Sequence, residues 1–203
     1  MEYLVTMTTH VPEGTAQEEV DDIRTREAGN SRRLAEKGQL LRLWRPPLRP
    51  GEWRTLGLFA ALDAERLEDV LASMPLRVWR SDEVTPLTQH PNDPGPASTG
   101  ESGAASEFLV TFAPAARQDA SSQAPADATA AEAVRAKELA GKGHLVRLWQ
   151  TPGEGRALGL WRARDPAEMQ SVLDSLPLAP WLSMETTPLS EHPNDPGAGL
   201  VRS

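Results

Sequence analysis

Residues 86–95 read PLTQHPNDPG and residues 188–197 read PLSEHPNDPG, so eight of ten positions are identical at a separation of 102. A second match lies upstream, where residues 38–44 (GQLLRLW) and 143–149 (GHLVRLW) are separated by 105. Matches that recur in the same order at nearly the same separation indicate an internal repeat. The chain is therefore predicted to be a tandem duplication of one domain of about ninety residues.

The limits of the two copies follow from their outermost matches. Residues 2–7 (EYLVTM) and 107–112 (EFLVTF) are again 105 apart, and the separation falls to 102 within the turn-rich stretch 45–54, where a change of length costs little. Between the copies lies NDPGPASTGESGAAS, which has the composition of a linker. We predict four segments: domain 1 at 1–95, a linker at 96–105, domain 2 at 106–197 and a tail at 198–203.

Each copy has the pattern of two helices among four strands. Apolar residues at Val20, Ile23 and Leu34 have helical spacing, and Gly38 stands where that helix should end. Asp63 precedes a second helical pattern in the position of an N-cap. The elements expected in the first copy are strands at 3–9, 39–45, 53–62 and 77–87 and helices at 15–37 and 64–73.

This order, β-α-β-β-α-β, is that of a ferredoxin-like unit, whose helices cover one face of the sheet and leave the other face open. Fusing two copies supplies a partner for the open face within the same chain. The predicted fold class is α+β, with tandem ferredoxin-like βαββαβ units that form a pseudo-dimeric α+β barrel.

The composition excludes several classes of function. The net charge is −8, and an acidic chain does not neutralise the phosphates of nucleic acid. There is no cysteine, and the four histidines show no metal-ligand spacing, so no metal site is expected. No apolar stretch reaches the length of a membrane span and the start of the chain does not resemble a signal peptide, so we expect a cytoplasmic protein without a membrane partner. Motifs for phosphate, dinucleotide and serine-nucleophile chemistry are also missing.

Glu27 is the most informative candidate for chemistry. It falls on the helical stripe of Val20, Ile23 and Leu34, and Glu132 occupies the equivalent position in the second copy. A carboxylate on an inward stripe is costly unless it is paired or functional. One interpretation is a general base or acid whose pKa burial raises, and the other is a helix glutamate paired with Arg42 or Arg45.

His90 and His192 lie in the two HPNDPG segments. Histidine is the side chain best suited to proton transfer near neutral pH, which makes both residues catalytic candidates. The same segment is also a good turn sequence, so a histidine that only ends a strand is the competing interpretation.

The two RLW triplets pair a cation with a large aromatic residue on one strand face, since residues two apart point the same way. The candidate substrate-binding residues are Arg42, Trp44, Arg45, Arg147 and Trp149. An arginine in this setting can hold a planar carboxylate through two hydrogen bonds. Core packing is the competing interpretation for both tryptophans.

Taken together, these motifs resemble the muconolactone Δ-isomerase family, and the resemblance covers nearly all of both copies. It is carried by the opening strand at 3–7, by Glu27 with Leu34 and Gly38, by the LWR triplet at 43–45, by the LPL turn at 176–178, by EVTPL at 83–87 and by His90-Pro91.

The resemblance implies a cofactor-free isomerase that moves a proton along a small unsaturated lactone bearing a carboxylate, through an enolate-like intermediate. Glutamate would transfer the proton and an arginine would hold the carboxylate. The second copy has Gln150 where the first has Arg45, which favours the first site. Family members are homo-oligomers of ferredoxin-like subunits, so a homo-oligomer of pseudo-dimers is expected.

Differences from the family leave the substrate open. A cyclase or isomerase acting on a polyketide-like carboxylate in natural-product biosynthesis (secondary metabolism) is one form of the enzyme hypothesis. The alternatives are a non-catalytic binding module for a hydrophobic small molecule and a structural pseudo-dimer that assists another enzyme. In each case but the last, the expected partner is a small molecule.

Overall fold

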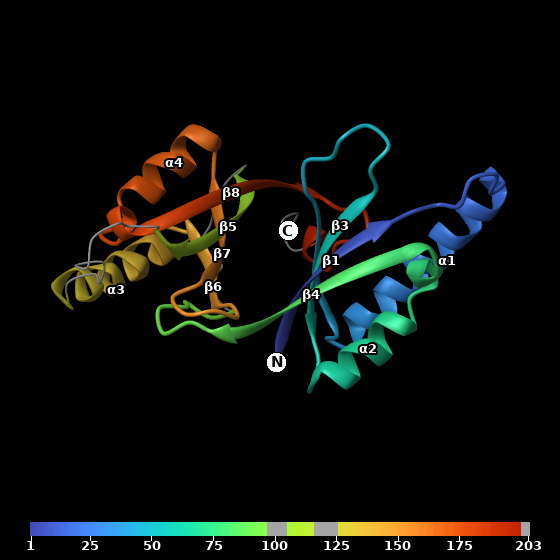
Figure 1. Cartoon of the computed structure of the whole chain (residues 1–203), viewed down its shortest axis with the longest axis horizontal. Coiled ribbons are helices and arrows are strands. Elements are labelled where there is room, and N and C mark those ends of the chain that lie inside the picture. The colour runs from blue at the N-terminus through green and yellow to red at the C-terminus, as the bar shows by residue number, and fades with distance from the viewer. Residues whose placement is uncertain (97–104, 116–125, 200–203) are drawn as a thin grey trace. The chain divides into compact units, whose positions relative to one another are not determined.

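The computed structural model describes residues 1–96, 105–115 and 126–199 (Figure 1). Most of the predicted linker and tail, at 97–104 and 200–203, lies outside the described residues. The first repeat contains β1 (Glu2–Thr9), α1 (Gln17–Glu36), β2 (Leu40–Arg45), β3 (Arg54–Ala60), α2 (Ala64–Ala72), a 3-10 turn (Pro75–Trp79) and β4 (Arg80–Gln89). The second repeat contains β5 (Ser106–Pro114), α3 (Ala126–Gly141), β6 (Leu145–Gln150), β7 (Ala157–Ala163), α4 (Pro166–Asp174), a 3-10 turn (Ala179–Trp181), β8 (Leu182–Glu191) and a final 3-10 turn (Pro196–Gly199).

Local sequence accounts for several of these elements. Side chains alternate between buried and partly exposed along β1, as expected for a strand with one covered face. The predicted N-cap forms, because the Asp63 carboxylate accepts a hydrogen bond of 2.8 Å from the backbone N–H of Arg66. Gly38 follows α1 with a φ of 66°, a left-handed conformation that glycine adopts without strain.

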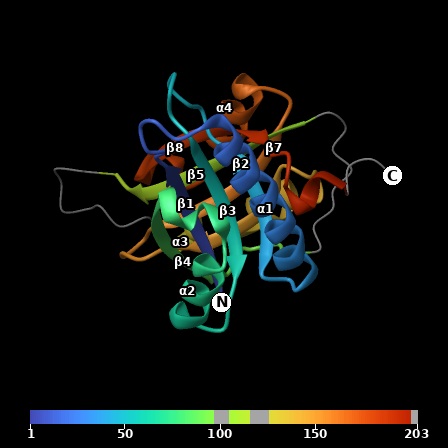
Figure 2. The same cartoon turned by 90° about the vertical axis from the view of Figure 1, so that its right-hand side faces the viewer.

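Contacts divide the chain into two units that do not coincide with the repeats. Unit 1 comprises Met1–Leu87 and the chain from Ser190 onward, and unit 2 comprises Thr88–Leu189. In unit 1, α1 and α2 lie on one face of the strands, as both views show (Figures 1 and 2). The predicted boundaries at 1–95, 96–105, 106–197 and 198–203 are those of the sequence repeats. They stay a prediction, because the two units are defined by contacts in space and not by the repeats.

The ends of β4 and β8 account for the composition of the units. The last two residues of β4, Thr88 and Gln89, pair with β6 in unit 2. The last two residues of β8, Ser190 and Glu191, pair with β2 in unit 1. Each HPNDPG segment is therefore part of the unit that the other repeat builds.

Strand pairing confirms the predicted fold class. Within each unit the pairing is antiparallel, and the hydrogen-bonded order over all strands is β1-β3-β2-β8-β5-β7-β6-β4, closing from β4 to β1. The described residues form eight strands in a closed order and four α-helices, and this arrangement of two βαββαβ repeats is that of the tandem ferredoxin-like α+β barrel class.

Glycines on the central strands make room for aromatic side chains of the two cores. A Cβ at Gly57 would lie 2.4 Å from Cε2 of Phe59, and a Cβ at Gly159 would lie 2.2 Å from Nε1 of Trp161. Phe59 and Trp161 are both buried. The glycine two residues before each ring therefore allows the ring to lie flat over its own strand.

No helix in the described part of the chain is long and apolar enough to cross a membrane.

Candidate functional site

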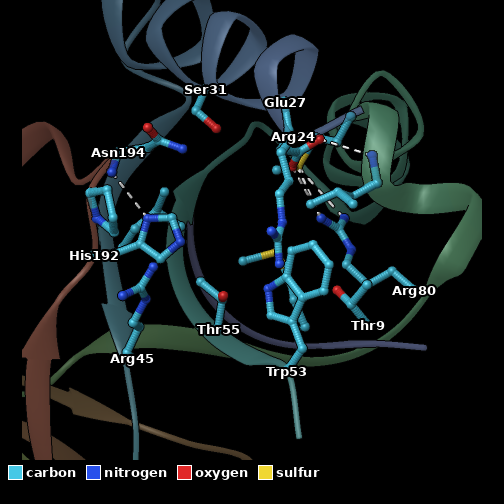
Figure 3. A pocket seen from close by; sticks show the side chains of 15 residues that line it. Thr9, Arg24, Glu27, Ser31, Arg45, Trp53, Thr55, Arg80, His192 and Asn194 are labelled. Carbon is cyan, nitrogen blue, oxygen red and sulfur yellow. Dashed lines mark hydrogen bonds and ion pairs between the residues drawn. The ribbon is translucent and has the colours of Figure 1, made fainter. Parts of the chain in front are cut away.

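A cavity of about 350 Å³ lies in unit 1 (Figure 3). Its walls come from β1, α1, β2, β3, the turn before β4, the first residue of β4, and the HPNDPG segment after β8. The polar and charged side chains that line it are Thr9, Arg24, Glu27, Ser31, Arg45, Thr55, Arg80, His192 and Asn194. The cavity thus contains two of the four predicted catalytic residues and one predicted binding residue.

Glu27 reaches this cavity from the buried stripe of α1 and is only 7% exposed. Its Oε2 accepts a hydrogen bond of 2.9 Å from the backbone N–H of Leu76, and its Oε1 lies 3.6 Å from Nη1 of Arg80. Burial raises the pKa of the Glu27 carboxyl, while the Leu76 N–H and the Arg80 charge oppose that rise. The prediction of an inward-facing glutamate is confirmed, but its cationic neighbour is Arg80 rather than Arg42 or Arg45.

Arg80 is a residue of the site that sequence reasoning missed. Its side chain is 2% exposed, and its Nε lies 2.6 Å from Oδ1 of Asp82, which is equally buried. Asp82 also forms an ion pair with Arg77. Since the second repeat has Leu182 in the equivalent place, comparison of the repeats gave no signal for Arg80.

His192 enters the cavity of unit 1 although it belongs to the second repeat. Burial, together with the nearby charge of Arg45, lowers the pKa of the imidazole to about 4, against an opposing effect of Asp195. The ring is therefore neutral near pH 7. Its Nδ1 faces the backbone N–H of Asn194 at 3.2 Å and accepts that hydrogen bond, which assigns the ring proton to Nε2.

Asp195 holds the HPNDPG segment of the second repeat on β2. Its carboxylate accepts hydrogen bonds from the Arg42 guanidinium at 3.0 and 3.1 Å and from the backbone N–H of Leu43 at 2.8 Å. The Arg42 guanidinium also lies over the ring of buried Trp44, 4.8 Å from its centroid. Arg42 and Trp44 are thus engaged in this attachment and do not line the cavity, whereas Arg45 does.

The same attachment recurs in unit 2. Asp93 accepts hydrogen bonds from the guanidinium of Arg147 at 3.2 Å and from the backbone N–H of Leu148 at 2.8 Å. The Arg147 guanidinium lies 4.8 Å from the ring centroid of Trp149, which is buried. Arg147 and Trp149 therefore correspond in structure to Arg42 and Trp44.

A cavity of about 1070 Å³ in unit 2 contains the other two predicted catalytic residues, Glu132 and His90. The Oε2 of Glu132 accepts a hydrogen bond of 2.9 Å from the N–H of Leu178, and burial raises the pKa of its carboxyl against that bond. The Nδ1 of His90 lies 3.1 Å from the N–H of Asn92, and burial lowers the pKa of the ring against the effect of Asp93. Each unit therefore combines a glutamate of one repeat with a histidine of the other.

Comparisons with known proteins agree with the repeat and with the fold. The family model described as muconolactone delta-isomerase matches residues 1–93 and 106–195. The chain is 30% identical over 92 residues to "Muconolactone Delta-isomerase 1" of Acinetobacter lwoffii, an alignment that covers 45% of this chain and 93% of that relative. One repeat therefore corresponds to nearly the whole relative.

Solved structures that match most of the chain in fold include the following two. A haem-binding protein from Thermus thermophilus has a TM-score of 0.59 at 12% identity and covers 96% of this chain and 93% of its own. A mutant chlorite dismutase from Candidatus Nitrospira defluvii has a TM-score of 0.60 at 12% identity and covers 93% of this chain and 91% of its own. At this identity the two matches support the fold class and carry no argument about ligands.

Proposed function

Because the chain belongs to the muconolactone delta-isomerase family, we propose that the cavity of unit 1 is the site of an isomerase that moves a proton on a small unsaturated lactone carrying a carboxylate. The observation that carries the proposal is the placement of Glu27. Its carboxyl lies on the cavity wall, is nearly enclosed, and has one oxygen held by a backbone N–H. A carboxyl with a raised pKa is suited to accept a proton from carbon and to return it.

The proton balance of such a reaction needs one carboxyl group. Glu27 in its carboxylate form removes a proton from the γ carbon of the unsaturated lactone, and the electron pair moves through the double bond to the carbonyl oxygen as a dienolate. The protonated carboxyl then delivers a proton to the α carbon, which shifts the double bond and restores the carbonyl; in D₂O, exchange of the carboxyl proton with solvent before this step introduces deuterium. Since Oε2 accepts the Leu76 N–H, we assign the proton transfer to Oε1.

His192 is suited to stabilise the charge that develops on the carbonyl oxygen. A neutral imidazole whose proton is on Nε2 is a hydrogen-bond donor and does not protonate the dienolate fully. Because Asn194 fixes the ring at Nδ1, the donor needs no reorganisation during the reaction. In this proposal His192 is therefore the electrophile and Glu27 is the base.

Arginines give the cavity its preference for an anionic substrate. Arg45 is exposed and lines the cavity, so it is placed to receive the carboxylate of the lactone. Arg80 is committed to Asp82 and stabilises the carboxylate form of Glu27, which limits the rise of the Glu27 pKa. Arg42, Arg147, Trp44 and Trp149 act in this proposal by holding the HPNDPG segments rather than by binding substrate.

The proposal is tested with muconolactone in D₂O, where NMR follows exchange at the γ and α carbons without requiring net turnover. Glu27→Gln keeps an acceptor for the Leu76 N–H but cannot take the proton, so exchange should fall by about a hundredfold or more. His192→Gln should reduce the rate and leave the bound fraction of lactone nearly unchanged. If Glu27→Gln exchanges at the wild-type rate, or changes only affinity as a binding module would, the proposal is wrong.

The comparisons give no support to a cyclase or to a polyketide-like substrate in secondary metabolism. A homo-oligomer of this chain stays a prediction, as does its place in the cytoplasm.

A further inference from the structure

The two cavities retain the same pair of titratable side chains and differ in the charges around it. Glu27 and His192 in unit 1 correspond to Glu132 and His90 in unit 2, and each member of each pair has the same backbone hydrogen bond. The machinery for proton transfer proposed for unit 1 is therefore present twice. What has changed between the copies is the rest of the cavity wall.

Three arginines line the cavity of unit 1 at positions where unit 2 has no charge. The pairs of equivalent lining residues are Arg24 and Thr129, Arg45 and Gln150, and Arg80 and Leu182. The second cavity also lacks two hydroxyl groups of the first, because Ser31 and Thr55 are replaced by Ala136 and Ala157. Among the described residues that line the second cavity, the only other charged side chains are Glu154 and Arg156, which are exposed and of opposite sign.

The second cavity is also larger and more aromatic. Its volume is about 1070 Å³ against about 350 Å³, and Gly155 stands where the first cavity has Trp53. Phe112, Trp161 and Trp181 contribute to its walls. These changes add apolar surface and space in the half of the molecule that has lost the arginines.

We propose that the cavity of unit 2 is a second proton-transfer site, for an uncharged and larger unsaturated carbonyl compound. A carboxylate brought beside Glu132 would meet none of the three guanidinium groups that line the first cavity, and an unpaired charge is costly to remove from water. An uncharged ester or lactone avoids that cost and gains from contact with the apolar wall. The use of Glu132 and His90 as base and electrophile rests on the function proposed for unit 1.

The test uses muconolactone and its methyl ester, which have the same reacting carbons and differ by one charge. Exchange in D₂O is measured for the whole chain and for Glu27→Gln and Glu132→Gln. The expected result is a crossover: exchange of muconolactone falls by about a hundredfold in Glu27→Gln, and exchange of the ester falls by about a hundredfold in Glu132→Gln. Exchange of the benzyl ester, which is larger than the methyl ester and also uncharged, should likewise fall in Glu132→Gln.

Failure of this inference is distinguishable from failure of the function proposed for unit 1. If both compounds depend on Glu27, or if the wild-type chain exchanges muconolactone but not its esters, the second site is refuted and the first stands. If muconolactone exchange does not depend on Glu27, the proposed function itself is refuted. Circular dichroism of both variants should match the wild type, because each glutamine keeps an acceptor for the N–H of Leu76 or Leu178.

A variant that gains affinity for an anionic compound provides an independent test of the charge argument. Gln150→Arg restores at an exposed position the cation that Arg45 supplies in unit 1. In a Glu27→Gln background this change should raise the affinity of the remaining site for muconolactone by about threefold and leave its affinity for the methyl ester unchanged. Equal effects on the two compounds would overturn the charge argument.

Discussion

Replacing Asp195 tests the contact that holds the HPNDPG segment of the second repeat on β2 of unit 1. Its side chain is 2% exposed and accepts hydrogen bonds from the Arg42 guanidinium and from the backbone N–H of Leu43. Asp195→Ala would remove the carboxylate to which the Arg42 guanidinium and the Leu43 N–H donate. Removing one partner of a buried ion pair costs about 3–5 kcal/mol.

The lower end of that range applies here. The Arg42 side chain is 21% exposed, so water can solvate part of the charge that Asp195 leaves behind. We therefore expect Asp195→Ala to lower the free energy of unfolding of unit 1 by about 3 kcal/mol. Asp195→Asn keeps an oxygen for the Leu43 N–H and removes only the charge, so its cost should be about 1–2 kcal/mol.

Urea denaturation followed by tryptophan fluorescence measures both variants through the shift of the transition midpoint. Asp93→Ala is a matched control, since Asp93 makes the same contacts to Arg147 and Leu148 in unit 2. Because Asp195 holds the segment that carries His192, Asp195→Ala should also slow exchange of muconolactone. A loss of less than about 1 kcal/mol, with unchanged exchange, would refute the reasoning.

Three further predictions concern stability. Because the pKa of His192 falls from 6.5 to about 4 on folding, only the unfolded chain binds the imidazole proton between these pH values. The free energy of unfolding should therefore decrease by about 2 kcal/mol, after solvent screening, as pH falls from 6.5 towards 4. The free energy of unfolding of the wild type minus that of His192→Gln should decrease over the same range, because the variant lacks the imidazole. Gly57→Ala would place a Cβ 2.4 Å from the ring of Phe59, and should cost about 1–3 kcal/mol in urea denaturation, whereas Gly29→Ala on α1, where a Cβ meets nothing within 4 Å, should not destabilise the chain. Asp63→Ala removes the N-cap of α2 and should lower the melting temperature by an amount corresponding to about 1 kcal/mol.

Features that depend on neighbours along the chain could be predicted from the sequence. The repeat, the element order, the N-cap at Asp63 and the inward position of Glu27 all follow from spacing over a few residues. These patterns are visible because a strand repeats every two residues and a helix every 3.6. Comparison of the two copies also showed that Glu27 and Glu132 occupy equivalent positions, as do His90 and His192.

The assignment of each histidine to a cavity was decided only by the tertiary structure. His192 lines the cavity that contains Glu27, and His90 lines the one that contains Glu132, because the last residues of β8 and β4 pair with the other repeat. Strand partners and ion pairs such as Arg42 with Asp195 join residues 153 positions apart, and no local periodicity encodes such a separation. The sequence by itself determined which side chains were available for chemistry, and long-range pairing decided which of them share a cavity.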